Sequence, residues 1–179
     1  MKRQNSINHS KNRLIGANNR SAGAAFEKLI EQSLEYYKQS GQSVIEKTPE
    51  PMRPISKPNA KGQFLAVYTH AAQPDYKGTL KGGQSVVFEA KHTDTDRLLF
   101  DRVTKEQRES MEMYYSAGSA AYIVISYGMR AFYVVPWEIF RDMQDIFGRK
   151  YVKETDIAGF QVGFSGFVRL LDGMKEVKG

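Results

Sequence analysis

The chain has no cysteine among its 179 residues. Disulfide bonds, thiolate nucleophiles and cysteine-ligated zinc sites are therefore excluded, which fits a reducing cytoplasm. Long hydrophobic runs are missing as well, because the most apolar stretch, residues 120–135, is interrupted by Arg130 and is too short to span a bilayer. Since the N-terminus also lacks a hydrophobic signal core, we expect a cytoplasmic protein with no membrane partner.

Acidic residues are absent from two segments. Residues 1–26 and residues 51–74 contain no aspartate or glutamate, while the whole chain has a formal net charge of +6. This balance favours an anionic partner such as nucleic acid, although a basic tail can also be no more than a solvated one. The DNA-binding residues that we expect are basic side chains of these two segments, namely Arg13, Arg20, Arg53, Lys57 and Lys61.

Two common functional motifs are also missing. The three histidines, His9, His70 and His92, do not have the spacing of a zinc-binding helix. The pair Gly82–Gly83 is not followed by the lysine and hydroxyl residue that end a phosphate-binding loop, so nucleotide hydrolysis is not supported. We expect His92 to be structural or to face DNA.

Length and composition indicate one folded domain, because 179 residues with 41% hydrophobic content can bury a sizeable core. We expect residues 1–18 to form a basic flexible N-terminal arm and residues 19–179 to form a single domain. Apolar residues at helical spacing predict a helix over residues 22–39. Alternating or continuous apolar runs predict strands over residues 43–47, 64–69, 85–91, 120–127 and 130–135.

Two further helices are expected. Thr104 is followed three residues later by Gln107, which is the pattern of a helix capping box, and Pro136 suits the first turn of a helix that ends near Phe147. The resulting fold class is α/β, with a mixed central sheet flanked by helices. Closely spaced prolines exclude a regular central strand or helix from residues 48–74, which should project from the domain as an arm.

The strongest chemical signal lies between Gln73 and Thr93. Glu89 and Lys91 are two residues apart in a predicted strand, so their side chains should project from one face, and Asp75 precedes them by a short hairpin. Carboxylates are preferred ligands of hard cations such as Mg²⁺, and a neighbouring lysine can orient a water molecule or stabilise charge on phosphate. This order is the signature of the PD-(D/E)xK nucleases, although alone it also fits a turn-forming aspartate and a Glu–Lys surface pair.

Longer segments surround this signature in a fixed order. The chain reads N-R-S-A-G-A-A-F-E-K-L-I from Asn19, then K-T-P-E-P, D-Y-K-G, F-E-A-K-H-T and E-Q-R-E-S-M. In order and spacing, residues 19–143 resemble the RecU family of Holliday junction resolvases, which occurs in bacteria and some of their phages. The resemblance implies a PD-(D/E)xK nuclease-like core and a metal-dependent endonuclease that resolves four-way DNA junctions in recombination and repair.

The resemblance also implies a metal site. Asp75, Glu89 and the carbonyl of Ala90 would hold Mg²⁺, with Mn²⁺ as the alternative ion, and Lys91 would orient the attacking water. Pro74 stands where the family usually has threonine, so a role of that hydroxyl does not carry over.

Two residues outside this set receive roles by resemblance. Glu27 aligns with an acid that supports the metal site in related nucleases, and its alternative is a solvated helical acid. Gln107 aligns with a glutamine near the scissile phosphate, and its alternative is the helix cap. Lys105 and Glu106 stand where the family often has histidines, whose roles do not carry over.

The partners implied by the resemblance are branched DNA, a second copy of the chain and a recombinase. A homodimer with two-fold symmetry would match the symmetry of a four-way junction, and the arm over residues 48–74 would enter the junction centre. Two other functions fit the same residues. One is another PD-(D/E)xK endonuclease of the restriction or repair type, and the other is a catalytically silent junction-binding protein that mediates recombination. Retention of Asp75, Glu89 and Lys91 argues against the silent protein.

Overall fold

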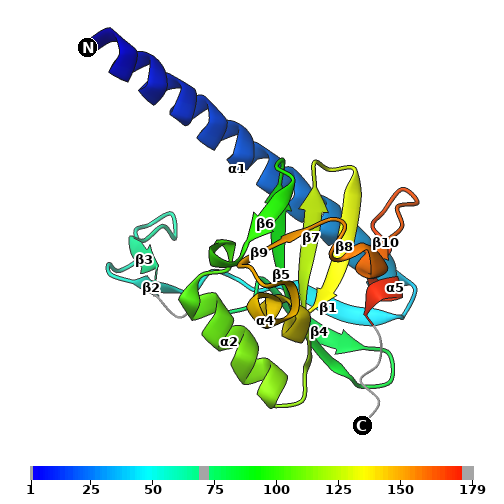
Figure 1. Ribbon diagram of the computed structural model, residues 1–179. Coiled ribbons are helices and arrows are strands. Elements are labelled where there is room, and N and C mark those ends of the chain that lie inside the picture. The colour runs from blue at the N-terminus through cyan, green and yellow to red at the C-terminus, as the bar shows by residue number, and fades with distance from the viewer. Residues whose placement is uncertain (1, 69–72, 175–179) are drawn as a thin grey trace.

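The structure is a computed structural model that describes residues 2–68 and 73–174, with side chains described from Ser21 onward. The longest helix, α1 (Lys2–Gln39), ends where the sequence predicts but begins 20 residues earlier than expected. Residues 2–18 of the expected flexible arm are therefore helical, and their flexibility stays a prediction. The segment has no proline, and the single Gly16 costs a helix only about 1 kcal/mol. Figure 1 shows this first half of α1 extending away from the body of the protein.

A six-stranded sheet forms the centre of the fold, and its strand order is β1-β4-β5-β7-β8-β10. The pair β5 and β7 is parallel and all other neighbours are antiparallel, so the predicted mixed sheet is confirmed. Helix α2 (Lys105–Ser116) lies in the connection between the two parallel strands. The strands are β1 (Ser43–Lys47), β4 (Tyr76–Leu80), β5 (Ser85–Thr93), β7 (Ala120–Tyr127), β8 (Ala131–Pro136) and β10 (Gln161–Val162).

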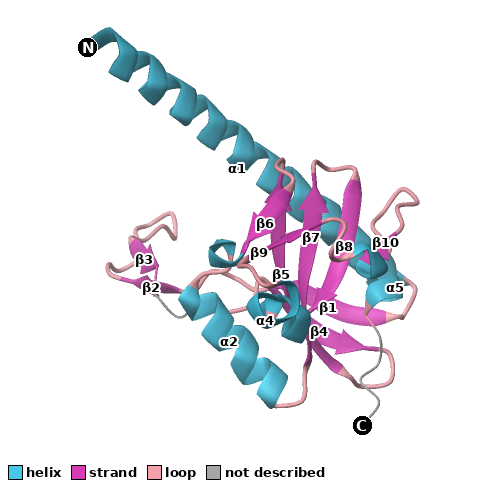
Figure 2. Cartoon of the chain, viewed as in Figure 1, coloured by secondary structure: helices cyan, strands magenta, loops and turns pink. Residues whose placement is uncertain are grey.

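Shorter elements surround this sheet (Figure 2). The helix expected from Pro136 consists of two short ones, which meet at Asp142. A short strand over residues 97–99, which follows β5, pairs with a strand over residues 151–153. The remaining elements are β2 (Met52–Pro54), β3 (Ala66–Tyr68), β6 (Arg97–Leu99), η1 (Phe100–Arg102), α3 (Trp137–Arg141), α4 (Met143–Phe147), β9 (Tyr151–Lys153), η2 (Ala158–Phe160) and α5 (Leu170–Gly173).

Both faces of the sheet are covered, and β5 contributes to both. Val86 and Phe88 pack with Phe26 of α1 in one hydrophobic cluster, whereas Val87 packs with Met111 of α2 in the other. The alternation places Glu89 and Lys91 on the face of Val87, the α2 side. Because β5 is buried on both sides, its sequence contains a long apolar run, which Glu89 and Lys91 interrupt.

The strands β1 and β4 approach each other closely at Gly78, the glycine of the D-Y-K-G motif. Gly78 is paired with Ile45, and a Cβ added at Gly78 would collide with the backbone of Val44 and Ile45. The glycine is therefore needed for packing, and it holds in place the strand that begins directly after Asp75.

The proline-containing segment projects from the sheet, as expected. Its two strands, β2 and β3, pair only with each other, and Figure 1 shows them beside the body of the protein. At its base the backbone N–H of Thr48 donates to the carbonyl of Asp75 at 2.8 Å. In the described ranges, no helix has the length and apolarity of a membrane span.

Candidate active site

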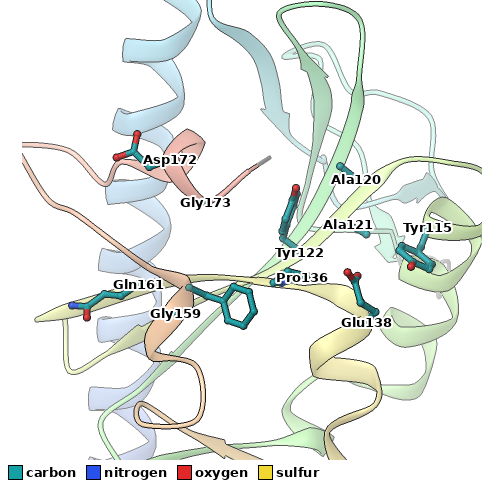
Figure 3. A pocket seen from close by; sticks show the side chains of 11 residues that line it. Tyr115, Ala120, Ala121, Tyr122, Pro136, Glu138, Gly159, Gln161, Asp172 and Gly173 are labelled. Carbon is teal, nitrogen blue, oxygen red and sulfur yellow. The ribbon is translucent and has the colours of Figure 1, made fainter. Parts of the chain in front are cut away.

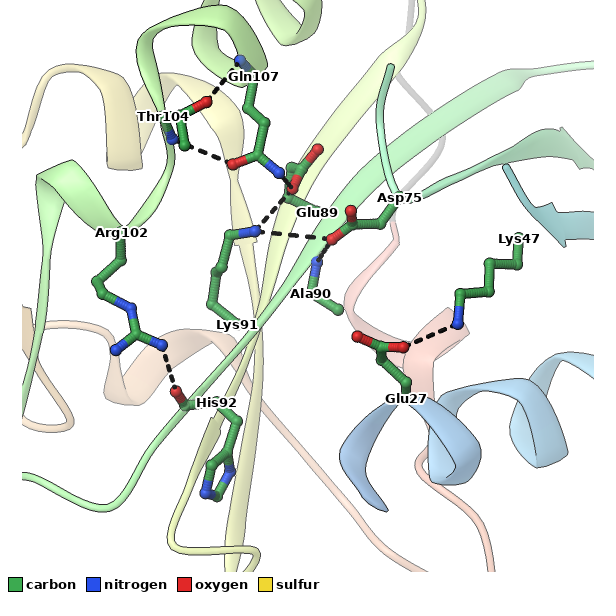
Figure 4. A network of polar contacts seen from close by, with 10 residues as sticks. All are labelled: Glu27, Lys47, Asp75, Glu89, Ala90, Lys91, His92, Arg102, Thr104 and Gln107. Carbon is green, nitrogen blue, oxygen red and sulfur yellow. Dashed lines mark hydrogen bonds and ion pairs between the residues drawn. The ribbon is translucent and has the colours of Figure 1, made fainter. Parts of the chain in front are cut away.

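Asp75 and Ala90 meet where the pairing of β4 with β5 ends. The last register pair is Tyr76 with Phe88, and beyond it the backbone N–H of Ala90 donates to Asp75 Oδ2 at 3.0 Å. Figure 4 shows this hydrogen bond. In a strand the N–H and C=O of one residue point to the same edge. The carbonyl of Ala90 therefore faces the edge of β5 at which the Asp75 carboxylate lies.

Lys91 lies between two carboxylates. Its Nζ is 2.8 Å from Glu89 Oε2 and 3.7 Å from Asp75 Oδ2. The side chain of Glu89 is fully buried, that of Lys91 is 13% exposed and that of Asp75 is 34% exposed, so access to solvent increases from Glu89 towards Asp75. The structure thus brings together the acid, acid and lysine that the sequence pattern singled out.

Gln107 joins this group from the first turn of α2. Its Nε2 donates to Glu89 Oε2 at 2.6 Å. Its Oε1 accepts from the backbone N–H of Thr104 at 3.1 Å, and its own N–H donates to Thr104 Oγ1 at 3.3 Å. The helix-cap interpretation of Gln107 is therefore correct, and the same side chain also contacts the proposed site (Figure 4). Because Oε1 faces Thr104, the amide must present its NH₂ group to Glu89.

Burial changes the acidity of Glu89. Desolvation raises the pKa of this carboxyl to about 8, although the ammonium of Lys91 acts in the opposite direction. Oε2 has two donors, from Lys91 and Gln107, whereas Oε1 is buried and has no hydrogen-bond partner among the described residues. An ionised carboxylate in this position is costly unless a proton or a cation satisfies the second oxygen.

The donor set at this point fits a divalent cation. It offers the unpartnered Glu89 Oε1, the partly exposed carboxylate of Asp75 and the carbonyl edge at Ala90, all of them hard oxygen ligands. A cluster of three or more metal-binding side chains is absent from the described part of the chain. A cation held here would thus take two carboxylates and complete its shell with backbone oxygen and water, as Mg²⁺ commonly does.

Glu27 is not part of this network in the structure. Its Oε2 is 2.8 Å from the Nζ of Lys47, which also contacts Glu31 at 3.1 Å, and Figure 4 shows Glu27 turned towards Lys47. The expected supporting role of Glu27 stays a prediction. Lys47, in the K-T-P-E-P segment, was not singled out from the sequence, because its ion pairs join helix α1 to a strand 16 to 20 residues away.

His92 has structural contacts and points away from Lys91. Its ring is buried between Ser126, at 3.2 Å from Nδ1, and Asp94, at 3.1 Å from Nε2. Its carbonyl accepts a hydrogen bond from Arg102 at 3.3 Å. Arg102, the last residue of η1, therefore contacts the backbone of the strand that carries Lys91 (Figure 4). No motif in the sequence identified this residue.

The predicted DNA-binding residues lie away from the carboxylates. Arg53, Lys57 and Lys61 are exposed and belong to the projecting arm. Arg13 and Arg20 lie on α1 outside the described side chains, so their contacts stay predictions.

Comparison with known families assigns the chain. The model of the family described as "RecU: Recombination protein U" matches residues 21–172, which is most of the sequence. The chain belongs to the RecU family. The match includes the whole network around Glu89 and the arm.

Two curated RecU relatives are similar to this chain. One, named Holliday junction resolvase RecU, from Streptococcus sanguinis (strain SK36), is 28% identical over 142 residues, which cover 76% of this chain and 70% of that protein. The other, of the same name, from Ligilactobacillus salivarius (strain UCC118), is 36% identical over 92 residues, covering 49% of this chain and 41% of that protein. Among solved structures, Archaeoglobus fulgidus Hjc, described as a Holliday junction resolvase, matches 72% of this chain and 89% of its own, with 12% identity and a TM-score of 0.47.

Proposed function

We propose that this RecU-family protein is a metal-dependent endonuclease that resolves four-way DNA junctions. The observation that carries the proposal is the buried Glu89. Lys91 and Gln107 hold one of its oxygens, and the other has no partner in the described part of the chain. The relatives named Holliday junction resolvase support the choice of a four-way junction as substrate.

Asp75, Glu89 and the carbonyl of Ala90 would hold the divalent ion, for which Mg²⁺ is our first choice and Mn²⁺ the alternative. Such an ion activates the attacking water and neutralises charge on the phosphate. The ammonium of Lys91, which contacts both carboxylates, would orient that water or contact a phosphate oxygen. Gln107 would keep the Glu89 carboxylate in one orientation.

The substrate needs two cuts in opposing strands, so we propose that two copies of the chain act as a homodimer whose two-fold axis coincides with that of the junction. The projecting arm would then enter the junction centre, where its exposed Arg53, Lys57 and Lys61 would contact phosphates. A recombinase that delivers junctions is the further partner we propose.

The test is cleavage of a synthetic four-way junction beside a linear duplex of the same sequence, with Mg²⁺, with Mn²⁺ and with chelator. We expect metal-dependent paired nicks in the junction alone. Asp75→Asn and Glu89→Gln should abolish cleavage and leave junction binding within about twofold, because each keeps the side-chain shape and removes a ligand charge. Equal cleavage of the duplex would identify a different kind of PD-(D/E)xK endonuclease. Binding without any cleavage by the unmodified protein would identify a silent junction-binding protein.

A further inference from the structure

A pocket of about 360 Å³ lies at the ends of β7 and β8, where β7 begins and β8 finishes (Figure 3). Its volume is within the range of organic ligand sites, roughly 300–1,000 Å³. None of its lining residues belongs to the network of Asp75, Glu89 and Lys91. The lining combines aromatic rings and carboxylates, and includes Tyr115, Tyr122, Pro136, Glu138, Phe160 and Asp172.

The charge of this lining is opposite to that of the protein. The chain has a net charge of +6, yet among the residues that the structure describes no lysine, arginine or histidine lines the pocket. A phosphate group is therefore disfavoured here, in contrast to the basic arm. The favoured ligand carries positive charge and an apolar or planar surface.

The two carboxylates differ in their availability. Asp172 is paired with Arg169 at 2.9 Å. Glu138 forms no ion pair within the described side chains, and Figure 3 shows its carboxylate turned towards the wall that carries Ala121 and Tyr122. Burial, with the negative charge of Glu138 as a second cause, raises the pKa of Tyr122 to about 12.

The basic side chain nearest to Glu138 along α3, that of Arg141, already contacts other acids. Arg141 is one turn after Glu138 in α3, and its guanidinium contacts Asp142 at 2.8 Å and Glu112 at 3.2 Å. The same guanidinium lies 5.5 Å from the ring centre of Tyr115. This wall of the pocket thus already has one ring with a guanidinium near its face, and Arg141 contacts Glu112 and Asp142 instead of pairing with Glu138.

We propose that the pocket binds a guanidinium ligand, with Glu138 as its anionic partner and the rings of Tyr122 and Phe160 as its stacking surface. A planar guanidinium can bind a carboxylate through two hydrogen bonds and stack on aromatic faces, whereas a compact ammonium has no comparable flat surface. The ligand is either an arginine side chain of a partner polypeptide or free arginine. The proposal does not depend on the nuclease function.

The test uses the full chain and compounds that separate charge from shape. Binding of N-acetyl-arginine methylamide is measured by calorimetry and by shifts of backbone amide signals. We expect shifts at Tyr122 and Phe160, binding at least tenfold weaker for the neutral citrulline analogue, and weaker binding for the lysine analogue. Tighter binding of the methylamide than of free arginine identifies a polypeptide source, and the reverse identifies the free amino acid.

Two variants complete the design. Glu138→Gln should weaken binding at least tenfold. Glu109→Gln, which removes an exposed α2 acid that pairs with Lys105 and does not line this pocket, should have no effect. Equal affinity for the citrulline analogue, unchanged binding by Glu138→Gln, or no shift at the pocket would each overturn the proposal. Melting temperatures of both variants check that the fold is intact.

Discussion

Gln107 and Glu89 are joined by a hydrogen bond of 2.6 Å, from the amide Nε2 to Oε2, across 18 positions of the chain. The same amide closes the capping box of α2 through Thr104. The start of α2 and the buried carboxylate of β5 are thereby held by one side chain. Loss of the Gln107 amide should therefore change the orientation of Glu89.

The first prediction separates the two roles of Gln107, as the helix cap of α2 and as a hydrogen-bond donor to Glu89. Gln107→Ala and Thr104→Ala should each cost about 1 kcal/mol of unfolding free energy, because each removes part of the cap. Only Gln107→Ala should also lower junction cleavage, by about tenfold, since it removes a hydrogen bond to a charged group. Thr104→Ala keeps the backbone N–H that orients the amide and serves as the matched control. Equal cleavage rates in the two variants would show that Gln107 acts only as a cap.

The second prediction concerns pH. In the fold, burial raises the pKa of Glu89 from 4.5 to about 8, so between these values the folded state binds more protons than the unfolded state. The unfolding free energy of the metal-free protein should therefore fall as pH rises, by up to about 1.4 kcal/mol per pH unit from this group. Urea denaturation with chelator at pH 5, 6.5 and 8 measures the fall, which Glu89→Gln should remove.

The same carboxyl predicts proton release on metal binding. Below pH 8 the divalent ion must displace the proton of Glu89, so its affinity should increase as pH rises towards 8. Calorimetry at pH 6.5 in two buffers with different ionisation enthalpies counts the released protons. A count near zero would mean that the ion binds without Glu89.

The third prediction uses two glycines. Gly78→Ala should destabilise the protein by about 1–3 kcal/mol or more, because the added methyl meets the backbone of β1. Gly23→Ala, at a helical position with nothing within 4 Å of the added atom, should stabilise it by about 0.5–1 kcal/mol. Chemical denaturation of both variants gives the comparison. If both variants were less stable than the unmodified protein, close packing of β1 on β4 would not be the cause of the loss in Gly78→Ala.

The fourth prediction concerns the arm. Replacing Arg53, Lys57 and Lys61 with alanine should weaken junction binding and reduce the slope of log affinity against log salt by about 0.9 for each lost phosphate contact. Lys81→Ala, which removes an exposed lysine at the far turn of the β4–β5 hairpin, is the control and should leave the slope unchanged. An unaltered slope in the triple variant would place the DNA contacts elsewhere.

Local patterns were enough to predict much of the site. The period of two along β5 placed Glu89 and Lys91 on one face, and the bounds of β1 and β7 agree with the apolar runs that predicted them. The spacing from Thr104 to Gln107 predicted the cap. These features depend on residues close in sequence, where backbone geometry alone determines which side chains are neighbours.

The features that the sequence did not predict depend on distant pairings or on weak local preference. The ion pairs of Lys47 with Glu27 and Glu31 require the register of β1 against α1. The contact of Gln107 with Glu89 requires the packing of α2 on the sheet. The early start of α1 at Lys2 contradicts the aperiodic polar pattern of residues 1–18, since a polar sequence without proline can be helical without burying a face.

The hydrogen bond between Thr48 and Asp75 closes the base of the arm. The segment between Thr48 and Asp75 could thus be replaced as a unit, because both of its ends are held in place at the sheet. Since the entropy of closing a loop changes only slowly with its length, arms of other lengths could be grafted at the same two positions. Chimaeras of this kind would allow shape recognition to be engineered separately from strand scission.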